Sequence, residues 1–287
     1  MAQRTLVVQL DVSRAKTLQR ELERSGFEFR GVPHASFSAR QDGVIATMYT
    51  SGKLVVQSAD PDTFCERFLG IAAEPRAETR EETTVGSDES GKGDYFGPLV
   101  VAAVRLEPEI ARELRGGPVR DSKLIDDESC LRLGAALRAK LPHAIARLDP
   151  PAYNVEHARV KNLNPMLAKL HGDVIKQLAS PGMLVVVDQF GPERLVAREV
   201  EGTDVRLVQR PRGEEILAVA AASVIAREQF LRGLQELSEQ WALDLCKGAG
   251  DPTDRSARKF VAVHGFDKLG NVAKLHFRTT QKIGGSR

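Results

Sequence analysis

The sequence predicts a two-domain α/β protein: a small α+β domain precedes a larger domain with a mixed β-sheet flanked by helices. The chain has 287 residues, more than a single domain usually holds, and 42% of them are hydrophobic. Strand and helix patterns alternate along it, except in residues 72–83, which are polar, charged and non-periodic. Such a stretch is typical of a linker, so we expect domains at residues 1–71 and 84–287.

The first domain has the pattern of a strand, a helix, several strands and a second helix. Residues 5–10 suit a strand, and residues 12–25 suit a helix that Gly26 ends. Further strands are expected at residues 36–39, 44–50 and 53–57, and a helix that starts at Asp60-Pro61 and runs to residue 69. Such a sheet has one covered face, which leaves the other face free for a partner.

The second domain begins with two apolar strands, near Val85 and at residues 99–104, that pair in antiparallel fashion across a glycine-rich turn. Helix and strand patterns then alternate. Helices are expected at 128–140, 165–178, 214 to about 241 and 253 to about 263, and strands at 144–148 and 183–187. Strands followed by alternating helices and strands favour a mixed sheet flanked by helices.

The stretch between those first two strands is the most informative one in the chain. Asp88 and Glu89 stand directly before Gly91-Lys92-Gly93. Neighbouring carboxylates at a strand end supply the oxygen ligands that hard divalent cations require, and bare glycine backbone lets a sugar-phosphate chain approach closely. A solvated hairpin turn beside a surface acid pair is the structural alternative for this segment taken alone.

A P-loop is a second alternative, because Gly86, Gly91 and Lys92 match the first part of that motif. Gly93 stands where the magnesium-binding hydroxyl belongs, and the two acids would lie among the phosphates. Residues 99–104 also suggest a buried strand, whereas a P-loop opens a helix. The motif therefore does not predict a nucleotide-binding loop.

A further acid ends the apolar run at residues 184–187. Asp188 therefore emerges at the end of a buried strand, the place where open α/β sheets put their ligands. An aspartate that caps the next helix is the alternative from local sequence. If the strands of Asp88 and Asp188 are neighbours in the sheet, the two carboxylates meet.

These segments together resemble the type 2 ribonucleases H, and within them ribonuclease HIII, where ribonuclease HII carries Gly-Arg-Gly in place of Gly-Lys-Gly. The resemblance covers residues from about 84 to the end. It rests on the acid pair with Gly91-Lys92-Gly93 and on five further blocks: Arg120-Asp121-Ser122-Lys123-Leu124, Asn162-Leu163-Asn164 with His171, Val185-Val186-Val187-Asp188, Ala220-Ala221-Ala222-Ser223 and Lys274-Leu275-His276-Phe277.

The resemblance implies a ribonuclease H-like fold and an endoribonuclease that cuts the RNA strand of RNA/DNA hybrids with two Mg²⁺ or Mn²⁺ ions, leaving 5′-phosphate and 3′-hydroxyl ends. It implies that Asp88, Glu89, Asp188 and a glutamate before the Ala220 helix hold the metal. The segment here is one residue shorter than the family pattern, so Glu214 and Glu215 are both candidates. We favour Glu214, which follows Gly213 at the expected helix start.

The resemblance also assigns substrate contacts and a role for the first domain. The expected contacts with the hybrid are Gly91, Lys92, Gly93, Ser122, Lys123 and Lys247. In the family, the first domain is similar in fold to half of the TATA-box-binding protein, and we expect residues 1–71 to bind substrate. From residue 251 onward eight lysines and arginines face three acids, which suits either a phosphate-binding patch or a solvated helix face.

The same residues leave two alternative functions, a ribonuclease HII-like enzyme and a non-catalytic hybrid-binding protein. A ribonuclease HII-like enzyme that cuts at single embedded ribonucleotides shares the acids, but Lys92 and the extra first domain oppose it. The four intact candidate acids argue against a hybrid-binding protein without catalytic activity. Cys65, Cys130 and Cys246 are too few and too far apart for a disulfide framework or a zinc site, and no apolar window is long enough to span a membrane. We therefore expect a cytoplasmic protein, and a monomer.

Overall fold

The computed structural model describes residues 4–70, 82–115, 117, 119 and 125–284. The chain divides into two compact units, Met1–Arg80 and Glu81–Arg287, which are described separately below. Nearly all of the expected linker, residues 72–83, lies outside the described residues. The same holds for Ser122 and Lys123, which were expected to contact substrate.

The N-terminal unit is a five-stranded antiparallel sheet with two helices on one face. Along the chain the elements are β1 (Arg4–Gln9), α1 (Val12–Arg24), β2 (Glu28–Arg30), β3 (Ala35–Gln41), β4 (Val44–Tyr49), β5 (Lys53–Ser58) and α2 (Pro61–Leu69). The strand order is β1-β5-β4-β3-β2. Leu18 of α1 and Phe64 of α2 pack with Ala39, Met48 and Val56 in one core, so both helices lie on the same side. Neither helix covers the opposite face of the sheet.

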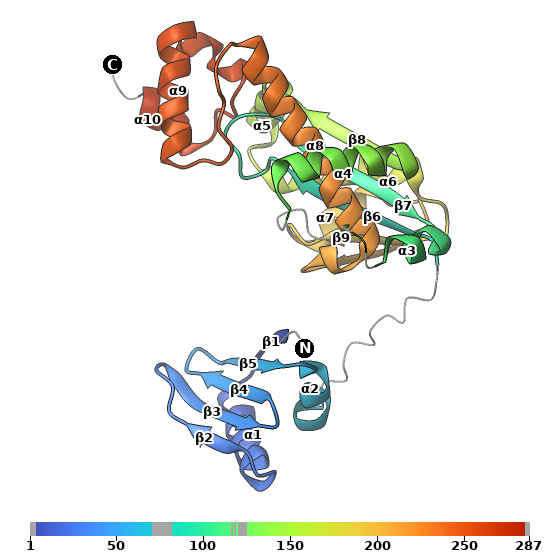
Figure 1. The fold of residues 1–287 in the computed structure, drawn as a ribbon, viewed down its shortest axis with the longest axis vertical. Coiled ribbons are helices and arrows are strands. Elements are labelled where there is room, and N and C mark those ends of the chain that lie inside the picture. Colours follow the sequence, from blue (N-terminus) through green and yellow to red (C-terminus); the bar gives the residue numbers. More distant parts are fainter. Residues whose placement is uncertain (1–3, 71–81, 116, 118, 120–124, 285–287) are drawn as a thin grey trace. The chain divides into compact units, whose positions relative to one another are not determined.

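The second unit is a mixed five-stranded sheet in the order β10-β9-β6-β7-β8 (Figure 1). Its strands are β6 (Thr84–Ser90), β7 (Leu99–Leu106), β8 (His143–Leu148), β9 (Leu184–Asp188) and β10 (Arg206–Arg210). β7 is antiparallel to β6 and β8, as expected for the pair across the glycine-rich turn, while β9 runs parallel to β6 and β10. The predicted mixed sheet is therefore confirmed.

Helices cover both faces of this sheet. α4 (Asp127–Lys140) and α8 (Leu217–Gln240) pack together on one face, where Figure 1 shows them side by side. The other face carries α5 (Pro150–Val160), α6 (Leu163–Leu178) and α7 (Glu193–Glu199). The remaining elements are α3 (Pro108–Leu114), α9 (Asp251–His264), α10 (Arg278–Gly284) and two short 3-10 turns, η2 (Gly213–Glu215) and η3 (Phe266–Asn271).

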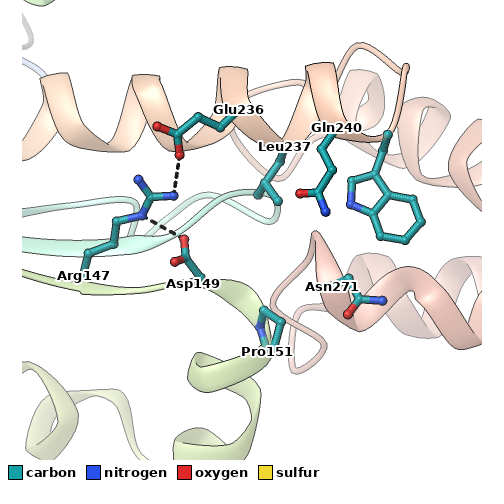
Figure 2. A pocket seen from close by; sticks show the side chains of 8 residues that line it. Arg147, Asp149, Pro151, Glu236, Leu237, Gln240 and Asn271 are labelled. Atoms are coloured by element: carbon teal, nitrogen blue, oxygen red, sulfur yellow. Dashed lines mark hydrogen bonds and ion pairs between the residues drawn. The ribbon is translucent and has the colours of Figure 1, made fainter.

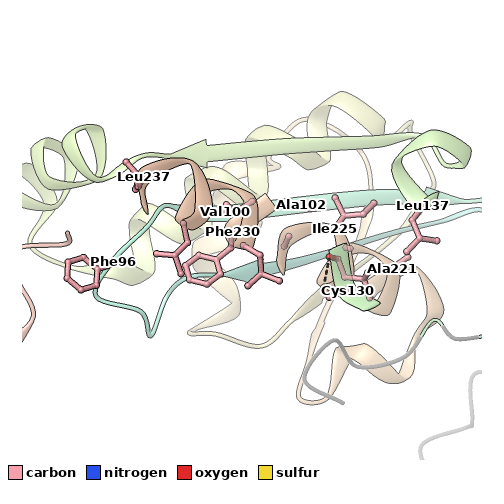
Figure 3. Packing of buried hydrophobic residues seen from close by; sticks show 14 of the residues in the cluster. Phe96, Val100, Ala102, Cys130, Leu137, Ala221, Ile225, Phe230 and Leu237 are labelled. Atoms are coloured by element: carbon pink, nitrogen blue, oxygen red, sulfur yellow. Dashed lines mark hydrogen bonds between the residues drawn. The ribbon is translucent and has the colours of Figure 1, made fainter. Parts of the chain in front are cut away.

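The central strand β7 explains why its sequence is a continuous apolar run. Val100 and Ala102 point into the layer of α4 and α8, where Figure 3 shows them against Ile225 and Phe230 of α8. Leu99, Val101 and Ala103 point into the opposite layer. A strand buried on both faces has no position for a polar side chain, so alternation disappears.

Helix α8 packs in close contact with β6, the strand that carries Asp88 and Glu89. A Cβ built on Gly86 would lie 2.3 Å from the carbonyl carbon of Ala218. The helix therefore lies directly on the strand at this point, and no larger residue fits without moving it. This contact sets the position of the next turn of α8, which carries Ser223.

Several element boundaries differ from the expected ones. The long helix begins at Leu217 rather than 214, because residues 213–215 form the turn η2. α6 begins at Leu163 rather than 165, with the Asn162 side chain as its cap. Strands β2 and β10 and the helices α3, α5, α7 and α10 were not predicted, because they are short or bury few residues. No helix in the described parts of the chain is long and apolar enough to cross a membrane.

Candidate active site

Two of the predicted acids lie side by side at the ends of parallel strands. β6 and β9 pair so that Ser87 is opposite Val187, which brings the next residues, Asp88 and Asp188, next to each other. Since Val187 points into the α6 layer, Asp188 points to the α8 side, as does Asp88. The backbone N–H of Gly213 donates to Asp188 Oδ1 at 2.8 Å, so η2 is attached to this aspartate.

Asp88 is almost completely buried, with 9% of its surface exposed. Burial raises the pKa of this carboxyl to about 8, and the nearby charges of Glu89 and Asp188 act in the same direction. A hydrogen bond with Ser223 and one from the backbone N–H of Glu89, at 2.7 Å, oppose the rise. The site therefore concentrates more negative charge than it can stabilise without a cation.

Glu89 points to the opposite side of the sheet from Asp88, because successive side chains of a strand alternate. One of its oxygens, Oε1, accepts from Lys92 Nζ at 2.9 Å, and the other, Oε2, lies 3.3 Å from His171 Nε2. Burial by itself would raise the pKa of Glu89, but the hydrogen bonds and charges of His171 and Lys92 outweigh it and lower the pKa. Glu89 is thus held as a carboxylate.

His171 of α6 is fully buried and contacts two residues of β6. Its Nδ1 lies 2.8 Å from Ser87 Oγ, and Ser87 donates its hydroxyl hydrogen to the carbonyl oxygen of Ala102 at 2.9 Å. The Ser87 hydroxyl thus lies within hydrogen-bonding distance of both the Ala102 carbonyl oxygen and Nδ1. With a hydrogen on Nε2, the ring donates to Glu89 Oε2.

The oxygen donors fit a hard divalent cation such as Mg²⁺ or Mn²⁺. Asp88 and Asp188 form a neighbouring pair whose mutual repulsion a cation relieves, and carboxylate oxygens are the ligands that such ions prefer. Within the described residues, no three histidine, cysteine, aspartate or glutamate side chains already form a group that could hold a metal ion.

The two candidates for the fourth acid have different surroundings. Glu214 is half-buried in η2, next to Gly213, whose N–H is bonded to Asp188. Glu215 is exposed and pairs with Arg210 Nη2 at 3.1 Å. Both lie in the turn before α8 rather than on the helix.

The predicted substrate-binding glycines differ in what the fold requires of them. Gly91 has φ +85°, and a Cβ there would lie 2.2 Å from the carbonyl oxygen of Pro98. At Gly93 a Cβ would meet nothing within 4 Å. The fold therefore requires glycine at 91 but not at 93, while Lys92 between them is exposed and bonded to Glu89.

Lys274 is one of the eight basic residues expected in a phosphate-binding patch or on a solvated face, but the structure buries it against this loop. Lys274 is fully buried and donates to the carbonyl oxygens of Asp94 at 2.9 Å and Gly97 at 2.7 Å. Burial lowers its pKa to about 7. The carboxylate of Asp94 in turn accepts from the backbone N–H of Gly248 at 2.6 Å. The sequence signal for this burial is that Lys274 lies between the apolar residues Ala273 and Leu275.

Two further features lie apart from the acids. Lys247, predicted to contact substrate, forms an ion pair with Asp127 at the start of α4. A surface pocket near the end of α8 contains none of the predicted site residues (Figure 2). In it Arg147 is bonded to both Asp149 and Glu236 at 2.8 Å, so the charge of this arginine is already neutralised.

The chain matches known proteins over nearly its whole length. A family model described as ribonuclease HII matches residues 85–280, and one described as a domain of unknown function (DUF3378) matches residues 5–81. Ribonuclease HIII of Protochlamydia amoebophila is 36% identical over 97% of this chain and 96% of its own. Ribonuclease HIII of Chlamydia pneumoniae is 35% identical over 96% and 97%. The crystal structure of Bst-RNase HIII in complex with Mn²⁺ is 30% identical, covers 98% of both chains and gives a TM-score of 0.69.

The fold and these matches define the protein as an enzyme, a ribonuclease H, with the ribonuclease H-like fold that the sequence predicted. Within that class, the chain belongs to the ribonuclease HIII family.

Proposed function

We propose that this ribonuclease hydrolyses the RNA strand of RNA/DNA hybrids, with Asp88, Glu89, Asp188 and Glu214 as ligands of two Mg²⁺ or Mn²⁺ ions. The observation that carries the proposal is the burial of Asp88 beside Asp188, which raises the pKa of Asp88 to about 8. Burying an acid such as Asp88 beside a second, half-buried acid costs stability, whereas a metal site needs such a pair. Glu214 is preferred to Glu215 because the latter is exposed and paired with Arg210.

The bound ions would supply an activated water and stabilise the leaving oxygen. Cleavage on the 3′-oxygen side then leaves a 5′-phosphate and a 3′-hydroxyl. The residues of the chain keep the ions in place: Ser223 holds Asp88, and Gly213 holds Asp188. The neighbouring 2′-hydroxyl takes no part in this chemistry and is free for recognition.

Recognition of RNA requires contact with the 2′-hydroxyl, and the Gly91-Lys92-Gly93 backbone is our candidate for it. Gly93 supports this role, because the fold leaves open space where its side chain would be. A ligand backbone can therefore approach the main chain there closely. Lys92 and Lys247 would bind phosphate, and so would Ser122 and Lys123 of the segment outside the described residues.

The N-terminal unit is proposed to bind the hybrid through the sheet face that α1 and α2 leave uncovered. Strand alternation puts Arg40, Lys53 and Gln57 on this face. Polar and basic side chains on an open sheet suit a nucleic-acid backbone. The monomeric state and the cytoplasmic location remain predictions from sequence.

The test measures cleavage of four 5′-labelled substrates: RNA paired with DNA, RNA paired with RNA, single-stranded RNA, and duplex DNA that contains one ribonucleotide. Each substrate is incubated with Mg²⁺, with Mn²⁺, or with EDTA. We expect metal-dependent cleavage of the hybrid alone or preferentially, and loss of turnover in Asp88→Asn and Asp188→Asn with hybrid binding retained. Preferred cleavage at the single ribonucleotide would instead support a ribonuclease HII-like activity. Binding without cleavage by the wild type would refute the enzymatic proposal.

A further inference from the structure

His171 connects the acid-bearing strand to the helix layer behind it. It is fully buried, and its two ring nitrogens contact residues on either side of Asp88 along β6. Nδ1 lies 2.8 Å from Ser87 Oγ, and Nε2 lies 3.3 Å from Glu89 Oε2. The ring therefore connects two residues of β6. One is Ser87, whose hydroxyl bonds to the neighbouring strand, and the other is Glu89, a proposed metal ligand.

Two contacts fix the orientation of this ring. Ser87 Oγ lies 2.8 Å from Nδ1 and is itself held 2.9 Å from the Ala102 carbonyl oxygen. Phe190, two residues beyond Asp188, stacks on the imidazole with ring centroids 4.9 Å apart and planes 9° apart. With one nitrogen bonded and one face covered, the ring cannot rotate about its axis without losing both contacts. Nε2 is thereby directed at Glu89.

The two oxygens of Glu89 are held by partners of very different mobility. Oε2 faces His171, which is fully buried, whereas Oε1 accepts from Lys92, whose side chain is 44% exposed. An exposed lysine on a surface turn is easily displaced by another cation, since such pairs contribute little energy. A buried imidazole that stacks on Phe190 is not easily displaced. One oxygen is therefore fixed, and the other can be offered to an incoming cation.

We propose that His171 is a positioning residue for metal binding: through the bond from Nε2 it orients Glu89 so that Oε1 can ligate a divalent ion. The inference rests on the proposed function, in which Glu89 is a ligand. Partners that orient metal ligands in this way contribute about 10- to 100-fold to metal affinity.

The test uses two isosteric replacements that separate the two bonds of the ring. In His171→Asn the amide nitrogen lies near the position of Nδ1, so it can donate to Ser87 but cannot reach Glu89. In His171→Gln the amide reaches the position of Nε2, so it can donate to Glu89 but leaves Ser87 without its contact to the ring. Mn²⁺ affinity of each full-length variant is measured by electron paramagnetic resonance without substrate, and folding is monitored by circular dichroism in EDTA.

We expect His171→Asn to weaken Mn²⁺ binding by about 10- to 100-fold and His171→Gln to stay within a few-fold of wild type. Equal losses in both, or a larger loss in His171→Gln, would mean that His171 only fills and braces the core, and the proposal fails. If neither variant folds, Lys92→Met provides a second measurement in the full chain. It removes the displaceable partner of Oε1, so Mn²⁺ affinity should rise or stay unchanged; a fall would overturn the division of roles between the two oxygens.

Glu89→Gln distinguishes failure of this inference from failure of the proposed function. If Glu89→Gln keeps wild-type Mn²⁺ affinity, Glu89 is not a ligand, and both the inference and that part of the proposed function fail. If Glu89→Gln weakens binding while His171→Asn does not, only the role of His171 is refuted.

Discussion

Asp88→Asn should stabilise the metal-free protein, and the gain should depend on pH. The pKa of Asp88 rises from 3.8 to about 8 on folding, mainly through burial. A carboxyl with a raised folded-state pKa contributes stability below its unfolded pKa and loses that contribution as pH rises through the folded value. Asparagine has nearly the same shape and never carries the charge, so it avoids this loss.

The size of the effect follows from the shift of about four pKa units. At pH 9 the carboxyl is ionised in both states, and asparagine should be more stable by at most about 6 kcal/mol. At pH 5 the folded carboxyl is protonated and only the unfolded chain gains from ionisation, so the difference falls to about 2 kcal/mol.

The assay is urea unfolding in EDTA at the two pH values, followed by the fluorescence of Trp241, the single tryptophan of the chain, which lies in the second unit. Glu215→Gln is the matched control, since this exposed acid forms a surface ion pair with Arg210 whose loss should change stability by less than about 1 kcal/mol. An equal stability gap between Asp88→Asn and wild type at pH 5 and pH 9 would refute the raised pKa. With saturating Mn²⁺ the order should reverse, because the metal binds the folded wild type more tightly than the variant.

Three further outcomes are expected. Gly91→Ala should lower stability by about 1–3 kcal/mol in thermal melts because of its positive φ and the contact with Pro98, whereas Gly93→Ala should melt like wild type but raise the KM for hybrid; the opposite ranking would contradict the assigned roles. Glu214→Gln should reduce kcat by orders of magnitude and Glu215→Gln only slightly, as single-turnover kinetics would measure. A chain that begins at Thr83 should still cleave at high substrate concentration, but bind hybrid more weakly and with a shallower salt dependence; an unchanged affinity would exclude the N-terminal unit from substrate binding.

Much of the fold could be predicted because its central parts are strongly patterned. The run at residues 99–104 indicated a buried strand, and the structure buries it on both faces. Short elements escaped prediction for a physical reason: β10 lies at the sheet edge, and α3 buries no residue fully, so neither shows a clear hydrophobic period. The start of α8 was misplaced by three residues because two glutamates favour a helix start equally well within a 3-10 turn.

The sequence predicted which residues form the candidate site, but it did not predict the directions of their side chains. Asp88 and Asp188 could be expected to meet if their strands were neighbours, and the structure pairs these strands. The sequence did not reveal that Glu89 turns toward a buried histidine, because His171 lies 82 residues away and a single histidine has no distinguishing spacing. The burial of Lys274 was not predicted for the same reason, since only the folded chain brings this lysine to the Asp94 and Gly97 carbonyls.

The alternation of side chains along β6 has a consequence for how this site is supported. Because Asp88 and Glu89 are consecutive, they point to opposite faces, and each depends on a different helix layer: Asp88 on Ser223 of α8, and Glu89 on His171 of α6. If both acids are metal ligands, as proposed, Ser223 and His171 would support the metal site through different ligands. Losses of metal affinity from Ser223→Ala and His171→Asn should therefore add when the two changes are combined.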